Sequence, residues 1–517
     1  MGNHHSKHWR DDDISTSPAG WSSWLDHFGS RSGTALHEAG ALIDPSPSPT
    51  LPHFDPGDFR SHQRIDNPYF PLIRGSVYTY GVLNDEGELE ERDDVFATFE
   101  NKMIAGVQTH VVRDTAYEDG RVSEDTLDFF AQDRQGNVWY FGELTYAFQY
   151  DDDGNFVGAS THGSWVADGV DAFPGYAMPT REVLEALVNG YYQEFAPGIA
   201  EDQADLVTFH GTADIDIGTF KDVLQTLDTT QLEPDAREFK KYEPGVGLVA
   251  AEELNEDGEV EAVEQLLGVR LLREDGIRHE LFHDTCDPDL RDLIVDDLGA
   301  GGFEQPELQD FRRAGSDVHV TFLGGDTESN DALGVYTFDR ETGLIDNVDI
   351  LFPETDGLKS GQEFIVELDK GEGYGLFLVP NGGDIGLDLS DFEDGGLEMR
   401  NFLTGGQASI YDRMAPQLID EDGNVLPIPA FHAIDVNTSD DWNLLNPAGG
   451  IQAVELDSDS LEHSAWDDKA EVLGFEDMFA SDPEFDGDFN DVVVAVSQAA
   501  LPSNLVTAMT EDLNLAV

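Results

Sequence analysis

Six oxygen-bearing side chains lie close together along the stretch 476–491, near the C-terminal end of the chain. They are five carboxylates and one amide: Glu476, Asp477, Asp486, Asp488, Asn490 and Asp491. Negative groups at this density repel one another unless a cation lies among them. Ca²⁺ is the natural candidate, because it takes about six to eight oxygen ligands in a flexible geometry. We therefore predict a calcium site that orders this loop.

The spacing of these donors begins like an EF-hand loop but does not continue as one. Asp486, Asp488 and Asn490 follow the pattern D-x-D-x-N with which an EF-hand loop starts. An EF-hand then requires Gly at its sixth position and a bidentate Glu at its twelfth, where this chain has Asp491 and Ser497. We interpret the stretch as an oxygen-rich loop that enters a sheet. The alternative is an acidic surface turn on a very acidic protein.

A second motif could carry a different chemistry. His279, Glu280 and His283 form an H-E-x-x-H pattern, and on a helix the two His would share Zn²⁺ while Glu280 acts as general base. A turn at Asp275–Gly276 precedes the motif, and Pro288 follows it, so a long surrounding helix is not expected. A zinc-dependent hydrolase stays open as an alternative function, beside a plain connector whose His residues face solvent.

The elements that must position the acidic loop are strands. The run Val492–Val496 directly follows Asp491 and is apolar and β-branched, which is typical of a strand buried on both faces. From Asp317 onward, strand-like runs are joined by long Gly- and Asp-rich loops, which predicts a β-sandwich or jelly-roll. From Ile65 onward, runs rich in Val, Tyr, Phe and Thr alternate with Asp-Gly and Gly-Asn turns, as in an antiparallel meander.

On this basis we divide the chain into five parts. They are a disordered leader over 1–60, an antiparallel β domain over 61–270, a helical connector over 271–315, a calcium-binding β-sandwich over 316–498 and a tail over 499–517. Within the first β domain, one helix is expected from Glu182 to Asn189, ended by Gly190. The predicted fold class is mostly β, with a curved sheet or meander followed by a jelly-roll-like sandwich.

Four aromatic side chains in the first β domain have two interpretations. Trp139, Tyr140, Phe141 and Trp165 lie in strand-like runs, where large rings usually pack in the core or across neighbouring strands. The alternative is that Trp139 and Trp165 line a groove, in which case the curved sheet would carry a small ligand or a lipid. A filled apolar interior would argue against such a carrier.

The composition limits the classes of partner. The 517 residues carry a formal net charge of −78, which argues against nucleic acid and anionic membrane surfaces and allows bound cations. The one cysteine, Cys286, excludes an intrachain disulfide. No run approaches the roughly 18 apolar residues of a membrane-spanning helix, so no membrane insertion is expected. The N-terminus lacks the apolar core of a Sec signal peptide, whereas the C-terminal tail resembles uncleaved type I secretion signals, so we expect export without a cleaved N-terminal signal.

Two resemblances extend these expectations. In the C-terminal half, the motifs are LGVY at 333–336, FLVPNG at 377–382, GFED at 474–477 and DGDFNDVV at 486–493. On these motifs, residues 316–498 resemble the domain of unknown function 4114 of secreted and surface-attached bacterial proteins, which often lies beside calcium-binding modules and adhesins. The resemblance implies an extracellular β-sandwich whose closing acidic loop is a calcium site.

The second resemblance covers residues 65–270. Its motifs are DNPYFP at 66–71, DTLD at 125–128, GNVWYFG at 136–142, GSW at 163–165, GTFKDV at 218–223 and YEPGVGL at 242–248. These resemble an uncharacterised family of bacterial extracytoplasmic β domains, which implies a fold and export but no activity. With no catalytic group identified, we expect a secreted, non-enzymatic calcium-binding protein with a structural or adhesive role at the cell surface or in the matrix.

Overall fold

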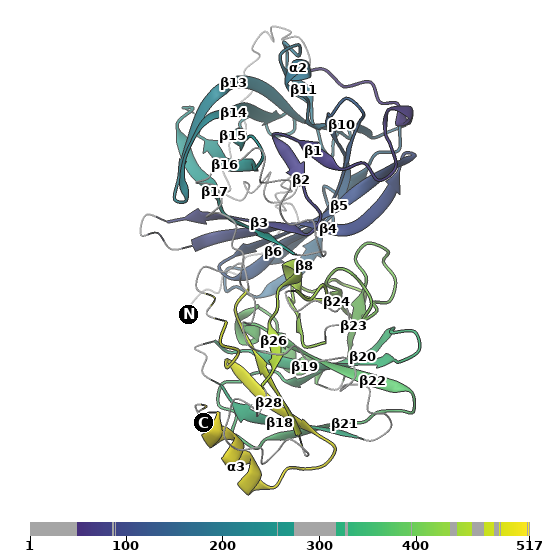
Figure 1. The fold of residues 1–517 in the computed structure, drawn as a ribbon, viewed down its shortest axis with the longest axis vertical. Coiled ribbons are helices and arrows are strands. Elements are labelled where there is room, and N and C mark those ends of the chain that lie inside the picture. Colours follow the sequence, from purple (N-terminus) through teal and green to yellow (C-terminus); the bar gives the residue numbers. More distant parts are fainter. Residues whose placement is uncertain are drawn as a thin grey trace, which may run out of the picture.

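The computed structural model describes most of the chain from residue 49 onward (Figure 1). The described residues are 49–84, 87, 89–255, 257–272, 317–325, 329–393, 395–434, 442–456, 470–479, 485, 487–513 and 515. Most of the predicted leader over 1–60 and of the predicted helical connector over 271–315 lies outside these ranges.

The N-terminal half is one large antiparallel sheet that curls on itself, so the prediction of a curved meander is confirmed. Its path runs through β11 (Tyr191–Tyr192), β13 (Asp202–Ile215), β14 (Gly218–Thr230), β15 (Arg237–Glu243), β16 (Gly247–Leu254), β17 (Val260–Leu271), β3 (Ser76–Leu83), β4 (Leu89–Ile104), β5 (Val107–Glu118), β6 (Arg121–Gln132), β7 (Val138–Tyr150), β10 (Phe173–Met178) and β12 (Glu194–Phe195). The short strands β8 (Phe156–Ser160) and β9 (Trp165–Val166) pair with β7.

The curled sheet nearly closes into a barrel. Its two terminal strands, β11 and β12, are consecutive in the sequence and are separated by Gln193 alone. The backbone N–H of Gln193 donates to the carbonyl oxygen of Asp202 in β13 at 2.9 Å, which links the two ends of the path. Near-closure of this kind leaves few unpaired strand edges.

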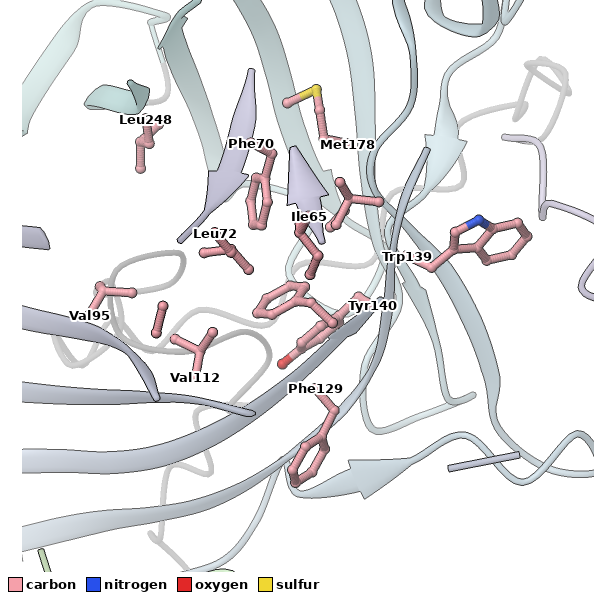
Figure 2. Close-up of a cluster of buried hydrophobic side chains, with 14 of the residues drawn as sticks. Ile65, Phe70, Leu72, Val95, Val112, Phe129, Trp139, Tyr140, Met178 and Leu248 are labelled. Atoms are coloured by element: carbon pink, nitrogen blue, oxygen red, sulfur yellow. The ribbon is translucent and has the colours of Figure 1, made fainter. Parts of the chain in front are cut away.

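A short hairpin fills part of the space inside the curve. Strands β1 (Ile65–Asn67) and β2 (Phe70–Leu72) pair with each other and lie within the large sheet (Figure 1). Figure 2 shows Ile65, Phe70 and Leu72 of the hairpin on the same side as Tyr140 of the sheet, whereas Trp139 and Phe129 point away from the hairpin; all belong to one buried cluster. The four aromatic residues Trp139, Tyr140, Phe141 and Trp165 are buried in this same cluster. Their place in the structure is therefore the packed core.

The C-terminal half is a β-sandwich of two antiparallel sheets, which confirms the predicted fold class. One sheet has the order β21 (Glu363–Val366), β18 (Val318–Gly324), β28 (Val492–Ser497), β27 (Ala470–Phe475) and β26 (Ala453–Glu455). The other has the order β24 (Gln417–Asp420), β23 (Leu397–Arg400), β20 (Ile345–Phe352), β19 (Ala332–Asp339), β22 (Glu372–Val379) and β25 (Phe431–His432). The run that follows the acidic loop is β28, which lies in the middle of its sheet and is buried throughout.

Two helical segments differ from the sequence-based expectation. The predicted helix from Glu182 to Asn189 is the shorter α2 (Arg181–Leu184), because its last turns tighten before Gly190 adopts a positive φ of 71°. The predicted tail contains α3 (Ser503–Asp512), whose Leu505, Val506 and Met509 pack on the outer face of the five-stranded sheet. In the part of the chain that the structure describes, no helix is long and apolar enough to cross a membrane.

The two halves are stacked along the long axis of the molecule and are joined by specific hydrogen bonds (Figure 1). The guanidinium of Arg113 donates to the carbonyl oxygen of Ala415 at 2.7 Å, and the Gln417 amide donates to the Asp125 carboxylate at 3.0 Å. The backbone N–H of Phe156 in β8 donates to the carbonyl oxygen of Gly386 at 2.8 Å. These contacts fix one end of the N-terminal sheet against loops and strands of the sandwich.

Candidate metal centre

The pairing of β27 with β28 brings the two ends of the acidic loop together. Phe475, the last residue of β27, lies opposite Val492, the first residue of β28. Glu476 and Asp477 follow one strand and Asp491 precedes the other, so antiparallel pairing places them at the same edge. One carboxylate oxygen from each of these three residues lies within 4.8 Å of the others. This spacing suits three ligands of one cation.

Close backbone packing holds both ends of the loop. The N–H of Asp477 donates to Oδ2 of Asp491 at 2.9 Å. A side chain at Gly474 would place its Cβ 2.1 Å from the carbonyl oxygen of Phe489, and one at Gly325 would place it 1.9 Å from that of Asp491. Both positions therefore require glycine, because any larger residue would push the loop away from the strands that anchor it.

The three carboxylates lie in a poorly solvated place. Glu476 is 1% exposed and Asp477 is 8% exposed, whereas Asp491 is partly exposed. Burial raises the pKa of Asp491 to about 7, and the nearby charges of Asp477 and Asp488 raise it too, against hydrogen bonds from Asp477 and Glu476 that lower it. Carboxylates forced together in this way gain most from a bound cation, which replaces their protons.

A fourth carboxylate, which the sequence analysis missed, lies within electrostatic reach of Asp477 and Asp491, although it is not among the three groups whose oxygens lie within 4.8 Å of one another. Asp331 directly precedes β19 of the opposite sheet and is fully buried, with 0% of its surface exposed. Its Oδ1 accepts the backbone N–H of Asn381 at 2.8 Å, whereas its buried Oδ2 has no hydrogen-bond partner. Burial raises the pKa of Asp331 to about 8, and the charges of Asp477 and Asp491 raise it too, so Asp331 lies within their electrostatic reach.

Two hydrogen bonds with Thr355 fix the backbone of Asp331. Its N–H donates to the hydroxyl of Thr355 at 3.0 Å, and its carbonyl oxygen accepts the N–H of Thr355 at 2.7 Å. A sequence signal did exist: Asp331 stands directly before the buried strand β19, as Asp491 stands directly before β28. That parallel could have identified it, but its proximity to Asp477 and Asp491 depends on how the two sheets face each other.

The other predicted ligands have different positions. Asp488 and Asn490 bond to each other: the Asn490 side-chain amide donates to Asp488 Oδ2 at 2.6 Å, and the Asn490 N–H donates to Asp488 Oδ1 at 3.2 Å. Through these two hydrogen bonds, Asp488 and Asn490 form a turn that leads to Asp491. Asp486 lies outside the described residues, as do His279, Glu280 and His283 of the H-E-x-x-H motif.

Buried carboxylates in the N-terminal half have another arrangement. The Tyr140 hydroxyl lies 2.6 Å from Asp128 Oδ1 and 2.9 Å from Glu143 Oε2, and both carboxyl groups are buried. Burial and the charge of Asp128 raise the pKa of Glu143 well above its usual range. The indole N–H of Trp165 donates to Glu194 at 2.7 Å. Across the described ranges, the one trio of acidic groups close enough for a shared metal is the C-terminal one.

Comparisons with known proteins add little to this geometry. No protein-family model matches the chain, and no curated protein matches it. A Bacteroides fragilis protein described as exported, with a YmcC-like fold, is 13% identical at a TM-score of 0.22, over 39% of this chain and 99% of that one. A Parabacteroides distasonis protein described as a lipoprotein is 11% identical at a TM-score of 0.21, over 39% and 98%. Similarity this weak carries no argument about location or function.

Proposed function

We propose that the protein is a non-enzymatic calcium-binding protein, in which Ca²⁺ binds Glu476, Asp477, Asp491 and Asp331 and stabilises the C-terminal β-sandwich. The observation that supports it is the trio of close carboxylates at the edge of one sheet, within electrostatic reach of the buried Asp331 of the facing sheet, whose Oδ2 has no hydrogen-bond partner. Buried charges are stable when they are paired or bound to a metal. A divalent cation among these four groups reduces their repulsion and provides a partner for Oδ2 of Asp331.

The chemistry of the donors favours Ca²⁺ over other common ions. All four groups are carboxylates, and hard oxygen donors without His or Cys suit Ca²⁺ or Mg²⁺ rather than Zn²⁺. Carboxylates can bind Ca²⁺ through one or both oxygens, which accommodates a set assembled from two sheets. The partly exposed side of Asp491 leaves a face on which water can complete the coordination shell.

The ion would act as a link between the two sheets of the sandwich. Glu476, Asp477 and Asp491 flank the paired strands β27 and β28, whereas Asp331 precedes β19 in the facing sheet. Binding to all four ties the sheets together at one edge. Because the unfolded chain has no such site, calcium binding adds directly to the free energy of unfolding, by about 2.7 kcal/mol when free Ca²⁺ is one hundredfold above its Kd.

A role outside the cytoplasm, at the cell surface or in the matrix, belongs to the same proposal. The support for it is the resemblance of residues 316–498 to a domain of secreted proteins, because the acidity of the chain fits a salt-adapted protein as well as a secreted one. Calcium is abundant outside cells, where a site of modest affinity would be filled. The zinc-hydrolase and carrier alternatives gain no supporting observation from the described residues.

Calorimetric titration of the full chain with Ca²⁺ at moderate salt tests this function. We expect saturable binding of about one ion per chain in the micromolar to millimolar range. Asp331→Asn combined with Asp491→Asn should abolish the saturable heat. Asp151→Asn is the matched control, since Asp151 lies in an exposed acidic turn of the other half and should leave binding unchanged. Heats that never saturate and vanish with salt would contradict the proposal.

A further inference from the structure

The chain leads directly from the metal centre into the contact between the two halves. Phe479 lies two residues after Asp477, and its ring packs against Phe431 of β25 with the centroids 5.0 Å apart. The same ring packs edge-on against Tyr117 of β5, with the centroids 4.7 Å apart. One aromatic side chain from the acidic loop therefore touches the core of the sandwich and the surface of the N-terminal sheet at once.

A buried arginine completes this contact. The guanidinium of Arg92 in β4 lies 4.0 Å from the centre of the Phe479 ring and 4.2 Å from that of Tyr117. Arg92 is 7% exposed and also pairs with Asp94 at 3.6 Å. A desolvated guanidinium is attracted to aromatic rings more strongly than an exposed one. Phe479 is thus held by a cation from the other half of the molecule.

Other contacts between the halves involve segments far from the metal centre in the sequence. Gln417 is the first residue of β24 and Ala415 lies just before that strand, whereas Gly386 lies in a loop after β22. Their positions follow from their own strands and turns. Phe479 differs, because its backbone continues from Glu476 and Asp477, whose carboxylates repel each other and Asp491 when all three are ionised and no cation lies among them.

We propose that Ca²⁺ at this centre strengthens the joint between the two halves of the protein through the contact made by Phe479. This inference rests on the proposed calcium binding. The ion fixes Glu476 and Asp477, and thereby holds Phe479 against Arg92 and Tyr117. Without the ion, repulsion loosens the segment 476–479 and weakens its hold on the N-terminal sheet. Because coupling between two equilibria is reciprocal, the formed joint also raises the affinity for Ca²⁺.

Hydrogen exchange of the full chain, with Ca²⁺ or with a chelator, tests the joint separately from binding. The N-terminal strands contain none of the proposed ligands, so a change there reports coupling. In the parent protein, we expect Ca²⁺ to slow exchange severalfold in peptides that cover β4 and β5. Phe479→Ala should still bind Ca²⁺ in calorimetry, with a several-fold weaker affinity, but should lose the calcium effect on β4 and β5.

Two further variants make the result decisive. Phe485→Ala removes another ring of the same loop, one that packs near Phe489 inside the C-terminal half, and should keep the calcium effect on β4 and β5. Arg92→Gln weakens the joint from the other side and should lose that effect even if Phe479→Ala folds poorly. Saturable calcium binding with unchanged exchange in β4 and β5 would contradict the proposed effect of calcium on the joint but not the proposed calcium binding. Absence of saturable binding in the parent would instead overturn the proposed function.

Discussion

The two halves of the molecule bury acidic side chains in opposite ways. In the N-terminal half, Asp128 and Glu143 share the Tyr140 hydroxyl, and Lys240 lies 3.1 Å from Glu238. These acidic groups are dispersed around the curled sheet, and their partners are a hydroxyl and an ammonium group of the protein itself. In the C-terminal half, three carboxylates crowd within 4.8 Å at one edge of the sandwich, with Asp331 close by.

This difference shows that burial of acids does not by itself define a metal site. A single hydroxyl has one proton to donate, so the pair around Tyr140 is stable when one carboxyl group keeps its own proton. Dispersed acids can be neutralised in that way, one at a time. A compact trio of carboxylates is better neutralised by one divalent ion. We therefore expect protons alone to control the first half, and calcium to compete with the protons of Asp331 and Asp491 in the second.

Removal of calcium should have the largest effect and should act mainly on the sandwich. If the ion contributes about 2.7 kcal/mol at a hundredfold excess over Kd, a chelator should lower the unfolding temperature of the C-terminal half by on the order of 5–10 °C. Differential scanning calorimetry with and without chelator measures this shift. An equal shift in Asp331→Asn plus Asp491→Asn would mean that the chelator acts somewhere other than this centre.

A change of pH should act on the N-terminal half whether or not calcium is bound, whereas in the C-terminal half the raised pKa values of Asp331 and Asp491 belong to the state without the ion. Burial raises the pKa of Glu238 to about 7 and that of Asp202 to about 6, although Lys240 opposes both shifts. The folded half thus keeps protons that the unfolded chain loses near pH 4. Their stabilising contribution is complete below that pH and is lost as the pH rises through about 6 and 7.

Urea unfolding of the N-terminal half at pH 5 and at pH 8 measures this loss. We expect the free energy of unfolding to be lower at pH 8 by on the order of 2 kcal/mol per group. Glu238→Gln should reduce the difference, and Glu182→Gln on the exposed surface of α2 should not. An increase in the free energy of unfolding of the N-terminal half from pH 5 to pH 8 would contradict this prediction.

Loss of the Tyr140 hydroxyl should have a smaller effect, again limited to the N-terminal half. Tyr140→Phe keeps the ring in the core but leaves the facing oxygens of Asp128 and Glu143 without this donor, at a cost of about 1–2 kcal/mol. Chemical denaturation checks the value, with Tyr411→Phe, at an exposed position, as the control. Unchanged stability in Tyr140→Phe would show that the hydroxyl is not needed to hold the two acids.

Much of this fold could be predicted from local sequence patterns. Alternating apolar residues and Asp-Gly turns indicate the antiparallel strands, and the apolar run at 492–496 indicates a buried strand. The same pattern places Glu476 and Asp477 at the end of one strand and Asp491 at the start of the next, although their sharing of one site depends on the pairing of β27 with β28. In these places, local propensity and tertiary structure agree.

The remaining features depend on contacts between distant segments. Asp331 comes within electrostatic reach of Asp477 and Asp491 because two sheets face each other, and no local pattern encodes how the sheets are arranged. Near-closure of the large sheet likewise depends on the pairing of β17 with β3 and on the meeting of β11 and β12. Helix α3 has apolar residues at helical spacing, but it gains its partner from the outer face of the five-stranded sheet.

The most direct test of the calcium centre is a crystal structure of the full chain grown with Ca²⁺, with the ion located by its anomalous scattering. We expect one ion at the edge of the sandwich, bound at about 2.3–2.6 Å by carboxylate oxygens of Glu476, Asp477, Asp491 and Asp331. An ordered cluster without an ion at saturating calcium, or an ion bound elsewhere in its place, would contradict the account.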